Sequence, residues 1–520
     1  MQRKVMIQAL EERSSPWDVL IIGGGATGLG AAVDAASRGY STLLLEQSDF
    51  AKATSSRSTK LVHGGVHYLE QGDIRLVFES MRERNFMLHN APHLVQSKAF
   101  VIPAYDWWDS PYYSFGLKLY DLMAGKLGMG ASDSLSREAT LEALPTLDQK
   151  NLRAGLSYYD GQFDDARMAI SLAKTSADHG GVVINYMKVT GLIKKGDMLA
   201  GVMALDVLHN KHYEIKSRVV INATGVFLED ILKLDNPQTK PVFKTSKGVH
   251  LVVDQKFLPG EHALLIPQTD DGKIFFAVPW YNRVILGTTD TQLSENQLEP
   301  KPGKDEIENI LNLAGQYLNL KPQIADIKSH YAGLRPFLPK EIDATRAKEI
   351  SRGHKIFISA SGLLSVIGGK WTTYRQMGVD IIDKAAQISQ LKAVKSRTEQ
   401  LPIHGFSPWQ GDLAMPWYGS DWPQLNALIK ARPELGQPIN SVFPYLKIAV
   451  LWAVKEEMAI SLEDVLARRT RMLFLDAKES IRIAPEVASL MASENGKNAK
   501  WIKEQISSFC ALAEGYCPPD

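Results

Sequence analysis

Three glycines and one acid near the N-terminus have the residue types and spacing of a dinucleotide site. Gly23, Gly25 and Gly28 fit the pattern GxGxxG, and Glu46 follows them. Such glycines permit a tight turn, a close approach of the backbone to a pyrophosphate, and packing of a helix on a strand. An acid about 20 residues later is expected to bind a ribose hydroxyl. The pattern therefore predicts dinucleotide binding, with the phosphates at a helix N-terminus.

A strand, a helix and a second strand must surround these residues if they are to act together. The apolar run WDVLII at 17–22 is typical of a buried parallel strand, and the alanine-rich stretch 29–38 predicts a helix that ends at Gly39. The run STLLL at 41–45 predicts the next strand, which Glu46 closes. The glycines thus lie at the strand-to-helix turn of a βαβ unit.

Two later segments indicate that the dinucleotide is FAD. The sequence has no second strand–GxGxxG–helix unit of the kind that a separate nicotinamide site usually needs, and no CxxxxC near the first helix, which excludes the pyridine-nucleotide disulfide oxidoreductases. VVINATG, ending at Gly225, resembles the strand that returns to the FAD domain in two-domain flavoproteins. IFISASGLLSVIGG, ending at Gly369, resembles their last FAD-contacting segment. One site revisited by distant pieces of chain favours FAD.

The composition excludes several other classes of protein. The 520 residues hold 59 Lys+Arg against 58 Asp+Glu, so there is no electrostatic footprint for nucleic acid. Two cysteines, Cys510 and Cys517, exclude a disulfide framework and a Cys-rich zinc site, and we expect free thiols in a reducing compartment. We expect no metal site. No run reaches the roughly 20 apolar residues of a membrane span, and residues 1–10 do not resemble a signal peptide.

Changes of character along the chain predict three domains. The strand-like runs 249–253, 273–278 and 284–286 suggest a substrate domain inserted into the FAD domain, and the helical pattern from 449 to 506 suggests a C-terminal helical domain. We predict a discontinuous FAD-binding domain over 16–100, 150–240 and 340–392, a substrate-binding cap over 101–149 and 241–339, and a helical domain over 393–520.

Several motifs together resemble the FAD-dependent glycerol-3-phosphate dehydrogenases, over nearly the whole chain and in the same order. They are ATSSRSTKLVHGGVHYLE at 53–70, YYDGQ at 158–162, DDAR at 164–167, GTTD at 287–290, YAGLRP at 331–336, SR at 351–352, GGKWTTYR at 368–375 and DVLARRT at 464–470. The resemblance implies an α/β fold: a Rossmann-type FAD-binding domain of the D-amino-acid-oxidase-like type with an inserted α+β substrate domain and a C-terminal helical domain.

The resemblance also implies a reaction and its partners. The family oxidises sn-glycerol 3-phosphate at C2 to dihydroxyacetone phosphate, and FAD takes the hydride. Reduced flavin then passes electrons to a membrane quinone, or to O₂ in some relatives. We therefore expect a cytoplasmic protein, and the sequence leaves open whether it is peripheral on the inner face of the membrane. The sequence leaves the acceptor, covalent attachment of FAD and the oligomeric state open, a homodimer included.

The family motifs carry cations suited to a phosphate dianion. Arg335, Arg352 and Lys370 are the predicted substrate cations, since Arg forms planar bidentate contacts and Lys acts as a point charge. His67, followed by Tyr68, stands where the family usually has an Arg that helps bind the phosphate. Because His is only partly charged near neutral pH, we expect His67→Arg to lower the apparent KM for glycerol 3-phosphate at pH 8.

The general base has two candidates, His250 in a strand-like run and His63 in the HGG turn. With Arg335 and Lys370 they make up the predicted catalytic residues. The predicted FAD contacts are Gly23, Gly25, Gly28, Glu46, Thr54, Ser55, Thr59, Lys60, Leu61, His63, Gly225, Gly369, Lys370 and Thr372.

Aromatic residues interleaved with lysines over 107–126 are typical of a membrane interface, although a packed cap or a dimer surface has the same composition. Absence of a Dx[DN]x[DN]G loop argues against the calcium-binding extension of some relatives.

Three other functions stay open: a glycerol-3-phosphate oxidase using O₂, an amine or amino-acid oxidase on the same fold, and a flavin-binding protein without catalysis.

Overall fold

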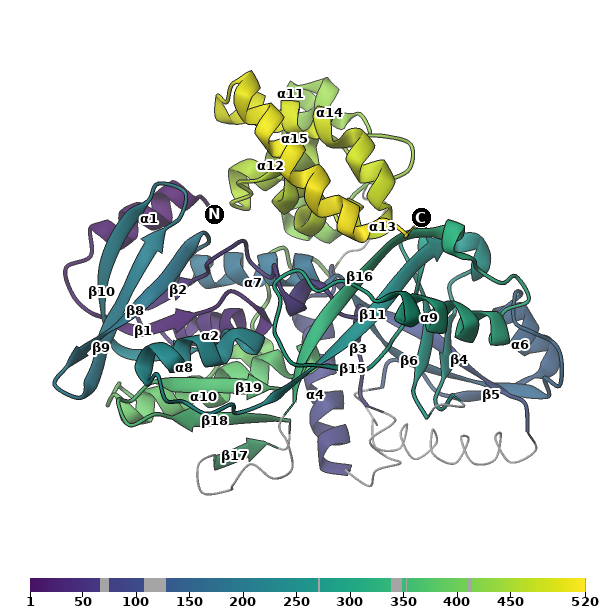
Figure 1. Cartoon of the computed structure of the whole chain (residues 1–520), viewed down its shortest axis with the longest axis horizontal. Coiled ribbons are helices and arrows are strands. Elements are labelled where there is room, and N and C mark those ends of the chain that lie inside the picture. The colour runs from purple at the N-terminus through teal and green to yellow at the C-terminus, as the bar shows by residue number, and fades with distance from the viewer. Residues whose placement is uncertain are drawn as a thin grey trace.

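The computed structural model describes residues 1–65, 74–106, 128–269, 272–337, 348–351, 353–408 and 414–519. Two large β-sheets lie beneath a domain of helices (Figure 1). The first sheet contains the N-terminal βαβ unit, and the second contains the strands of the predicted substrate domain. The candidate site is built where the two sheets and the helical domain meet.

The first sheet has a parallel centre whose strands are buried on both faces. Strand β1 (Trp17–Ile22) lies between β2 (Thr42–Leu45) and β10 (Lys211–Asn222). Strand β7 (Val182–Ile184) continues the sheet beyond β2, and β19 (Leu364–Gly368) continues it beyond β10, both in parallel. Burial on both faces explains why these strands read as continuous apolar runs.

Helix α2 (Ala26–Ser37) packs closely against α10 (Tyr374–Ile388). A Cβ on Gly30 would lie 2.8 Å from the carbonyl oxygen of Tyr374, and one on Gly378 would lie 2.7 Å from that of Gly30. These two glycines let the helix backbones touch. The contact fixes α2 with its N-terminus at the end of β1.

The other elements around the first sheet extend it in antiparallel fashion or cover it. They are α1 (Arg3–Glu11), α7 (Asp165–Asp178), β8 (Met187–Lys195), β9 (Met198–Asp206), α8 (Leu228–Asp235), β17 (Lys348–Ser351) and β18 (His354–Ile358).

The second sheet is antiparallel except for one parallel pair, β4 with β12. Its strands are β3 (Leu61–Val62), β4 (Val95–Ala104), β5 (Asp133–Ser136), β6 (Ala154–Phe163), β11 (Lys244–Asp254), β12 (Ala263–Ile266), β13 (Phe275–Trp280), β14 (Arg283–Gly287), β15 (Thr291–Leu293) and β16 (Ile327–Phe337). Helices α6 (Arg137–Ala143) and α9 (Lys304–Tyr317) accompany it, whereas Met87 of α4 (Ile74–Asn90) packs in the apolar core of the first sheet. An apolar core of β11, β14 and α9 side chains fixes the position of β11, which carries His250.

The strand assignments differ from the predicted domain boundaries in one respect. Strands β3, β4 and β6 fall largely or wholly inside segments predicted for the FAD-binding domain, yet they pair with one another in the second sheet. The apolar pattern of a strand reports its burial but not its partner, so the boundary could not be drawn from the sequence. Residues 394–398 also pack on the first domain, where Arg38 donates to the carbonyl of Val394 and Asn90 to that of Thr398.

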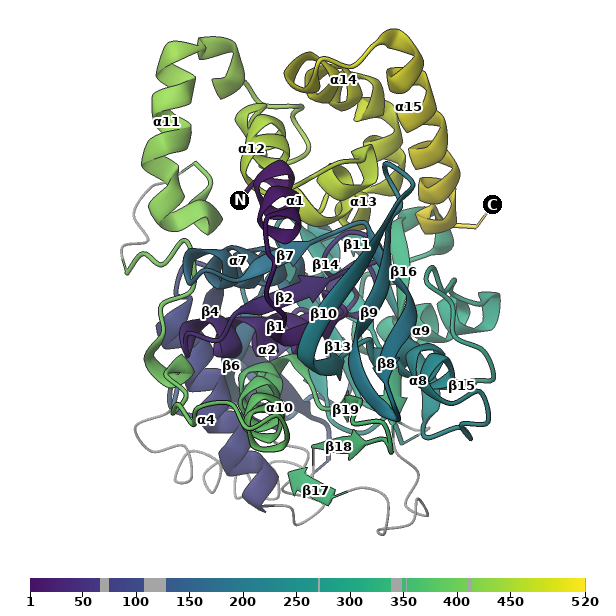
Figure 2. The same cartoon turned by 90° about the vertical axis from the view of Figure 1, so that its left-hand side faces the viewer.

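The C-terminal helices form a separate layer over the junction of the two sheets (Figure 1; Figure 2 gives the side view). They are α11 (Trp422–Ala431), α12 (Ile448–Glu456), a π-helical turn (Asp464–Arg469), α13 (Met472–Leu475), α14 (Ala477–Asn495) and α15 (Ala499–Ala513). Their own apolar cluster also includes Trp280 and Tyr331 of the second sheet. The helical domain is therefore packed on the second sheet.

Within the described parts of the chain, no helix is both long and apolar enough to cross a bilayer. The same residues contain no group of three or more His, Cys, Asp or Glu side chains arranged to hold a metal ion. Cys510 and Cys517 are free thiols.

Candidate active site

The glycine-rich turn joins β1 to α2 with the geometry that its sequence predicts. Gly23 has φ +109°, and a Cβ there would lie 2.7 Å from the carbonyl oxygen of Ala223, which follows the neighbouring strand β10. A Cβ on Gly28 would clash with the carbonyl oxygen of Gly23, so only glycine lets the helix lie this close. Gly25 is the N-cap of α2 and has no side chain to cover the first amides of the helix. The turn thus leaves a helix N-terminus suited to a phosphate.

Glu46 lies at the end of β2 beside this turn. One carboxylate oxygen, Oε2, accepts from the amide of Gly24 at 2.7 Å, and the other accepts from the amide of Ser48 at 2.8 Å. Burial raises the pKa of Glu46 above its ordinary value, against the effect of these two amides. The predicted ribose ligand therefore lies beside the glycine turn.

Three distant pieces of chain meet at this edge of the first sheet. Ile22 is in register with Asn222, and Asn222 with Ser365. The glycines that follow these strands have left-handed backbones, with φ +109° at Gly23, +59° at Gly225 and +74° at Gly369. Ligands of open α/β sheets bind beyond the carboxyl ends of the strands. The pieces predicted to contact FAD are thus brought together.

Residues 54–60, called the 54–60 loop below, connect this edge to the second sheet. The hydroxyl of Ser55 accepts from the amide of Ala26 at the start of α2 at 2.9 Å, and Trp371 Nε1 donates to the carbonyl of Ser55 at 3.0 Å. The hydroxyl of Thr54 donates to the carbonyl of Leu334 on β16 at 2.7 Å. Thr54 and Ser55 therefore lie beside the predicted phosphate site.

Thr59 and His250 form the central contact between the loop and the second sheet. Thr59 Oγ1 and His250 Nε2 are 2.9 Å apart, within hydrogen-bond distance. The His250 ring also stacks on Tyr331, with centroids 4.9 Å apart and 16° between the planes, and the Tyr331 hydroxyl donates to the carbonyl of Ser58 at 3.0 Å. His250 Nδ1 is buried without a hydrogen-bond partner among the described residues, so Thr59 alone holds the ring by a hydrogen bond.

His250 is neutral in this setting. Burial lowers its pKa well below the ordinary value, and the positive charges of Arg335 and Lys60 lower it further. The side chain is 1% exposed, whereas Thr59 is half-buried. Thr59 is therefore the more exposed residue of the pair.

Arg335 extends from β16, where it is paired with Ser246 of β11. Its Nη2 donates to Thr288 Oγ1 at 3.0 Å. A Cβ on Gly248 would lie 2.5 Å from this nitrogen, so Gly248 makes room for the guanidinium. The side chain is solvent-exposed, yet surrounding protein lowers the pKa of Arg335 by desolvation, against the attraction of Asp290. The exposed guanidinium is accessible to an anion and has the planar donor geometry that suits a phosphate.

Lys370 follows the two left-handed glycines, Gly368 and Gly369, and begins the turn that carries Trp371 and Thr372. A Cβ on Gly369 would clash with the Met377 side chain, so the turn depends on glycine. Through Trp371 this turn is bonded to the 54–60 loop, and Thr372 is 1% exposed within it. The GGKWTT motif thus lies against the same loop as His250.

The side chain of Lys60 points away from the predicted cofactor site. Its ammonium is 0% exposed and donates to Asp165 Oδ2 at 2.6 Å and to the carbonyl of Ser56 at 2.8 Å. Burial lowers the pKa of Lys60 to about 7, although Asp165 favours its charged form. Only the backbone of Lys60 is left to face a ligand, because the ammonium is used inside the protein. Leu61, next in the chain, is buried on β3.

Asp165 contacts the 54–60 loop, and sequence reasoning did not single it out although it lies in the DDAR motif. Its carboxylate accepts from the amide of Ser58 at 3.1 Å, the Ser58 hydroxyl at 2.7 Å, Lys60 Nζ at 2.6 Å and Arg471 Nη2 at 3.0 Å. Its pKa lies below the usual range because Lys60 and Arg471 outweigh burial. Asp165 therefore fixes the 54–60 loop through Ser58 and Lys60.

Asp160 fixes the backbone of the HGG turn, as Asp165 fixes that of the 54–60 loop. Its Oδ1 accepts from the amide of Gly64 at 3.0 Å and from Arg84 Nη1 at 2.6 Å. His63, the second candidate base, precedes this anchored turn and is half-buried. The YYDGQ motif thus fixes the backbone next to His63.

The remaining predicted residues fall outside the described parts of the chain. His67, Tyr68 and Arg352, together with the predicted membrane segment 107–126, are among them. Their roles stay predictions. Besides Asp165, the geometry adds Tyr331 and Thr288 to the site. Both lie in family-like motifs, which is the one sequence signal that marked them.

Comparison with known proteins agrees with this architecture. Residues 18–375 match the family of FAD dependent oxidoreductases, and residues 367–502 match the C-terminal domain of alpha-glycerophosphate oxidase. The mitochondrial glycerol-3-phosphate dehydrogenase of Bos taurus is 38% identical over 95% of this chain and 72% of its own length. The Arabidopsis thaliana mitochondrial enzyme SDP6 is 36% identical over 95% of this chain and 84% of its own.

Solved structures confirm the predicted fold class. The glycerol-3-phosphate dehydrogenase of Bacillus halodurans, complexed with FAD, superposes with a TM-score of 0.81 and 28% identity, covering 99% of this chain and 98% of that one. An L-alpha-glycerophosphate oxidase from Mycoplasma pneumoniae with FAD bound shares the fold, with a TM-score of 0.56 and 18% identity over 74% and 97% of the two chains. The cofactor prediction, FAD, is confirmed as well. The chain belongs to the FAD-dependent glycerol-3-phosphate dehydrogenase family.

Proposed function

We propose that this protein oxidises sn-glycerol 3-phosphate to dihydroxyacetone phosphate and passes the electrons to a membrane quinone. The observation that carries the proposal is the contact of Thr59 with His250 beside Arg335, near the edge where the segments predicted to contact FAD converge. FAD, when bound, supplies the acceptor for the hydride that leaves C2. The relatives named glycerol-3-phosphate dehydrogenase support the choice of substrate.

The proton of the C2 hydroxyl needs a base, and His250 is our choice over His63. His250 is neutral, as a base must be, and it is 1% exposed behind the half-buried Thr59. In the tautomer with Nε2 unprotonated, the Thr59 hydroxyl donates to the ring. The substrate proton can then move to Thr59 Oγ1 as the Thr59 proton moves to Nε2.

The same geometry explains a preference for a phosphorylated alcohol. Arg335 opposes protonation of His250 by its charge. A phosphate dianion bound by Arg335, with Lys370 and Arg352 as the other proposed cations, would offset that charge. Proton uptake by His250 becomes easier only when the anionic substrate is in place, so glycerol itself should be a poor substrate.

Flavin bleaching under anaerobic conditions tests the proposal. Glycerol 3-phosphate should bleach the FAD absorbance of the holoprotein, whereas glycerol and amino acids should leave it unchanged. Bleaching by amino acids and not by glycerol 3-phosphate would replace this function with that of an amino-acid oxidase. No bleaching by any of these compounds would favour a flavin-binding protein without catalysis.

The electron acceptor can be identified by reoxidising the flavin in the same sample after it has been reduced. We expect a soluble quinone analogue to reoxidise the flavin much faster than O₂ does. Rapid reoxidation by O₂ would instead identify an oxidase, which is the open alternative because residues 367–502 match a domain named for alpha-glycerophosphate oxidase. Binding to lipid vesicles in the same preparation would support the proposed membrane contact through residues 107–126.

A further inference from the structure

The C-terminal helical domain reaches the 54–60 loop at two points. Arg471 Nη2 donates to the carbonyl of Ser56 at 2.8 Å, and Arg57 Nη2 donates to the Tyr516 hydroxyl at 3.0 Å. We propose that this domain is a positioning element of the active site and that Arg471 is its positioning residue. The domain contacts Ser56 and Arg57 of the loop, whereas Ser55 contacts α2 and Thr59 contacts His250.

Arg471 is fixed more tightly than a docking contact requires. It is 0% exposed and has a left-handed backbone with φ +57°. Besides Ser56 it bonds to Asp165 Oδ1 at 3.0 Å and to the carbonyl of Ala467 at 2.9 Å, and its guanidinium lies 4.3 Å from the Phe474 ring centroid. A non-glycine residue keeps such a backbone only where its surroundings demand it.

The 54–60 loop connects Arg471 both to the start of α2 and to His250. Ser55, one residue before the carbonyl that Arg471 holds, accepts from the first amide of α2. Ser58 and Lys60, on either side of Thr59, are both bonded to Asp165. Because Asp165 is also bonded to Arg471, the position of the Thr59 hydroxyl against His250 depends on a residue of the C-terminal domain.

The chemistry of the contact requires a guanidinium. Arg471 uses a forked group to reach the carbonyls of Ala467 and Ser56 and the carboxylate of Asp165 at once. A lysine supplies one compact ammonium and cannot span these acceptors from one side chain. Arg471→Lys should therefore keep the charge and release the loop.

The test compares Arg471→Lys and Arg471→Met with the wild-type holoprotein. The measurements are the FAD dissociation constant, the visible circular dichroism of the flavin, and the rate of reduction per bound flavin by glycerol 3-phosphate. Misplacing catalytic groups by about 1 Å can cost up to about a hundredfold in rate, so we expect FAD affinity and reduction rate to fall by about tenfold or more. The dichroism should change as well.

Two further variants keep the result decisive. Arg482→Gln, at an exposed position on α14, should match the wild type in all three measurements. Tyr516→Phe removes the hydroxyl that receives Arg57 and leaves Arg471 in place, so it should shift FAD affinity in the same direction by a smaller factor. If the Arg471 variants do not fold, Tyr516→Phe decides the question.

Wild-type FAD affinity, dichroism and reduction rate in folded Arg471→Lys and Tyr516→Phe would overturn the proposal, even if their unfolding midpoints fall. The reduction rate rests on the proposed function, but the FAD affinity and dichroism need no substrate. Failure of wild-type bleaching with intact FAD effects would therefore remove the proposed function and leave this inference standing.

Discussion

At the scale of single residues, the candidate active site contains a hydrogen bond between the hydroxyl of Thr59 and the buried ring of His250. His250 has the Tyr331 ring on one side and Thr59 at Nε2, with Nδ1 unpartnered among the described residues. Stacking restrains the plane of the ring, and among the described residues Thr59 supplies its one side-chain hydrogen-bond partner. Thr59 stays a predicted FAD contact, and its hydroxyl lies within hydrogen-bond distance of the candidate base.

We predict that Thr59→Val slows flavin reduction by glycerol 3-phosphate by about ten- to a hundredfold, since general-base steps contribute about 10²–10⁴. Thr59→Ser keeps the hydroxyl and should stay within about threefold of the wild type. Stopped-flow bleaching of holoproteins with equal FAD content gives both rates. His63→Asn serves as the comparison. A greater loss there than in Thr59→Val and His250→Asn would transfer the role of base to His63.

At the scale of elements, a buried cluster of charged side chains stabilises the 54–60 loop. Lys60, Asp165 and Arg471 are all 0% exposed, with two cations on one carboxylate. The Lys60 ammonium also lies 5.1 Å from the Tyr331 ring centroid and 5.5 Å from those of Trp280 and Phe474. Such a cage excludes water, which explains why burial dominates the shift in the Lys60 pKa.

We predict from the lowered pKa of Lys60 that the free energy of unfolding depends on pH. Its pKa is about 7 in the folded protein, so between about pH 7 and the ordinary lysine value the unfolded chain binds more protons than the folded one. Stability from this group therefore rises with pH across that window, by on the order of 1 kcal/mol per pH unit. Below about pH 7 both states are protonated and the dependence ends.

Lys60→Met isolates this contribution. The free energy of unfolding of the wild type minus that of Lys60→Met should increase between pH 7 and pH 9, as measured by denaturant titration at each pH. Lys500→Met, at an exposed position, should show a flat difference over the same range. A flat difference for Lys60→Met as well would mean that Lys60 keeps an ordinary pKa.

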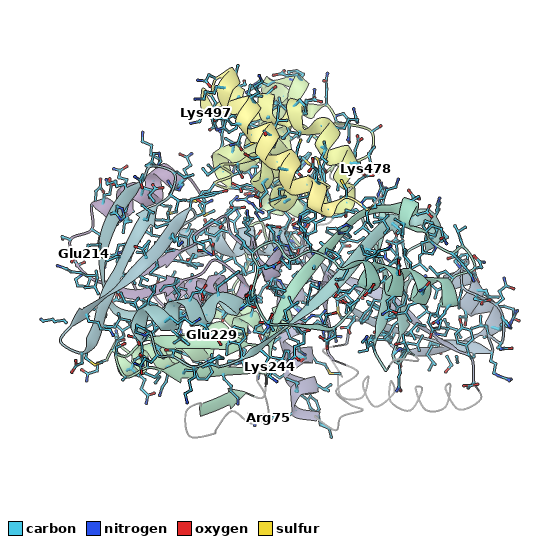
Figure 3. The ribbon with its side chains drawn as sticks, viewed as in Figure 1. Arg75, Glu214, Glu229, Lys244, Lys478 and Lys497 are labelled. Carbon is cyan, nitrogen blue, oxygen red and sulfur yellow. The ribbon has the colours of Figure 1, made fainter. Side chains whose placement is uncertain are left out.

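At the scale of the whole molecule, buried ion pairs join the helical domain to the first domain. Arg167 on α7 forms a bidentate pair with Glu457 at 2.7 Å for both bonds, and Asp49 pairs with Arg468 and Arg469 of the π-helical turn. The charged side chains labelled at the periphery in Figure 3, Glu214 and Lys497 among them, point outward instead. The DVLARRT motif is thus explained as the part of the helical domain that packs on the FAD domain.

We predict that Glu457→Gln lowers the free energy of unfolding by about 3–5 kcal/mol, because Arg167 is left buried without its counter-charge. Glu434→Gln removes an exposed pair with Arg432 and should cost at most about 1 kcal/mol. Denaturant-induced unfolding of the two holoproteins, followed by far-UV circular dichroism, makes the comparison. Equal costs in the two variants would refute a docking role for the buried pair.

The sequence alone determined the parts of this protein that are local. The βαβ unit, its glycine turn and Glu46 could be predicted because strand, turn and helix signals are carried by neighbouring residues. His250 and Arg335 could be named as candidates from family-like motifs, since residue type limits which side chain can act as a base or bind an anion. The class of fold and the cofactor followed from these parts.

Only the tertiary structure decided which of these residues meet. Strands β3, β4 and β6 pair in the second sheet, a choice made by long-range hydrogen bonding that no local pattern records. The Lys60 ammonium is buried inside the protein because Asp165, 105 residues away in the chain, holds it. Arg471 reaches the same carboxylate from 306 residues away, so the C-terminal domain contacts the 54–60 loop through an ion pair that forms only in the folded chain. Contacts between such distant residues depend on burial and three-dimensional register, which the order of residues does not display.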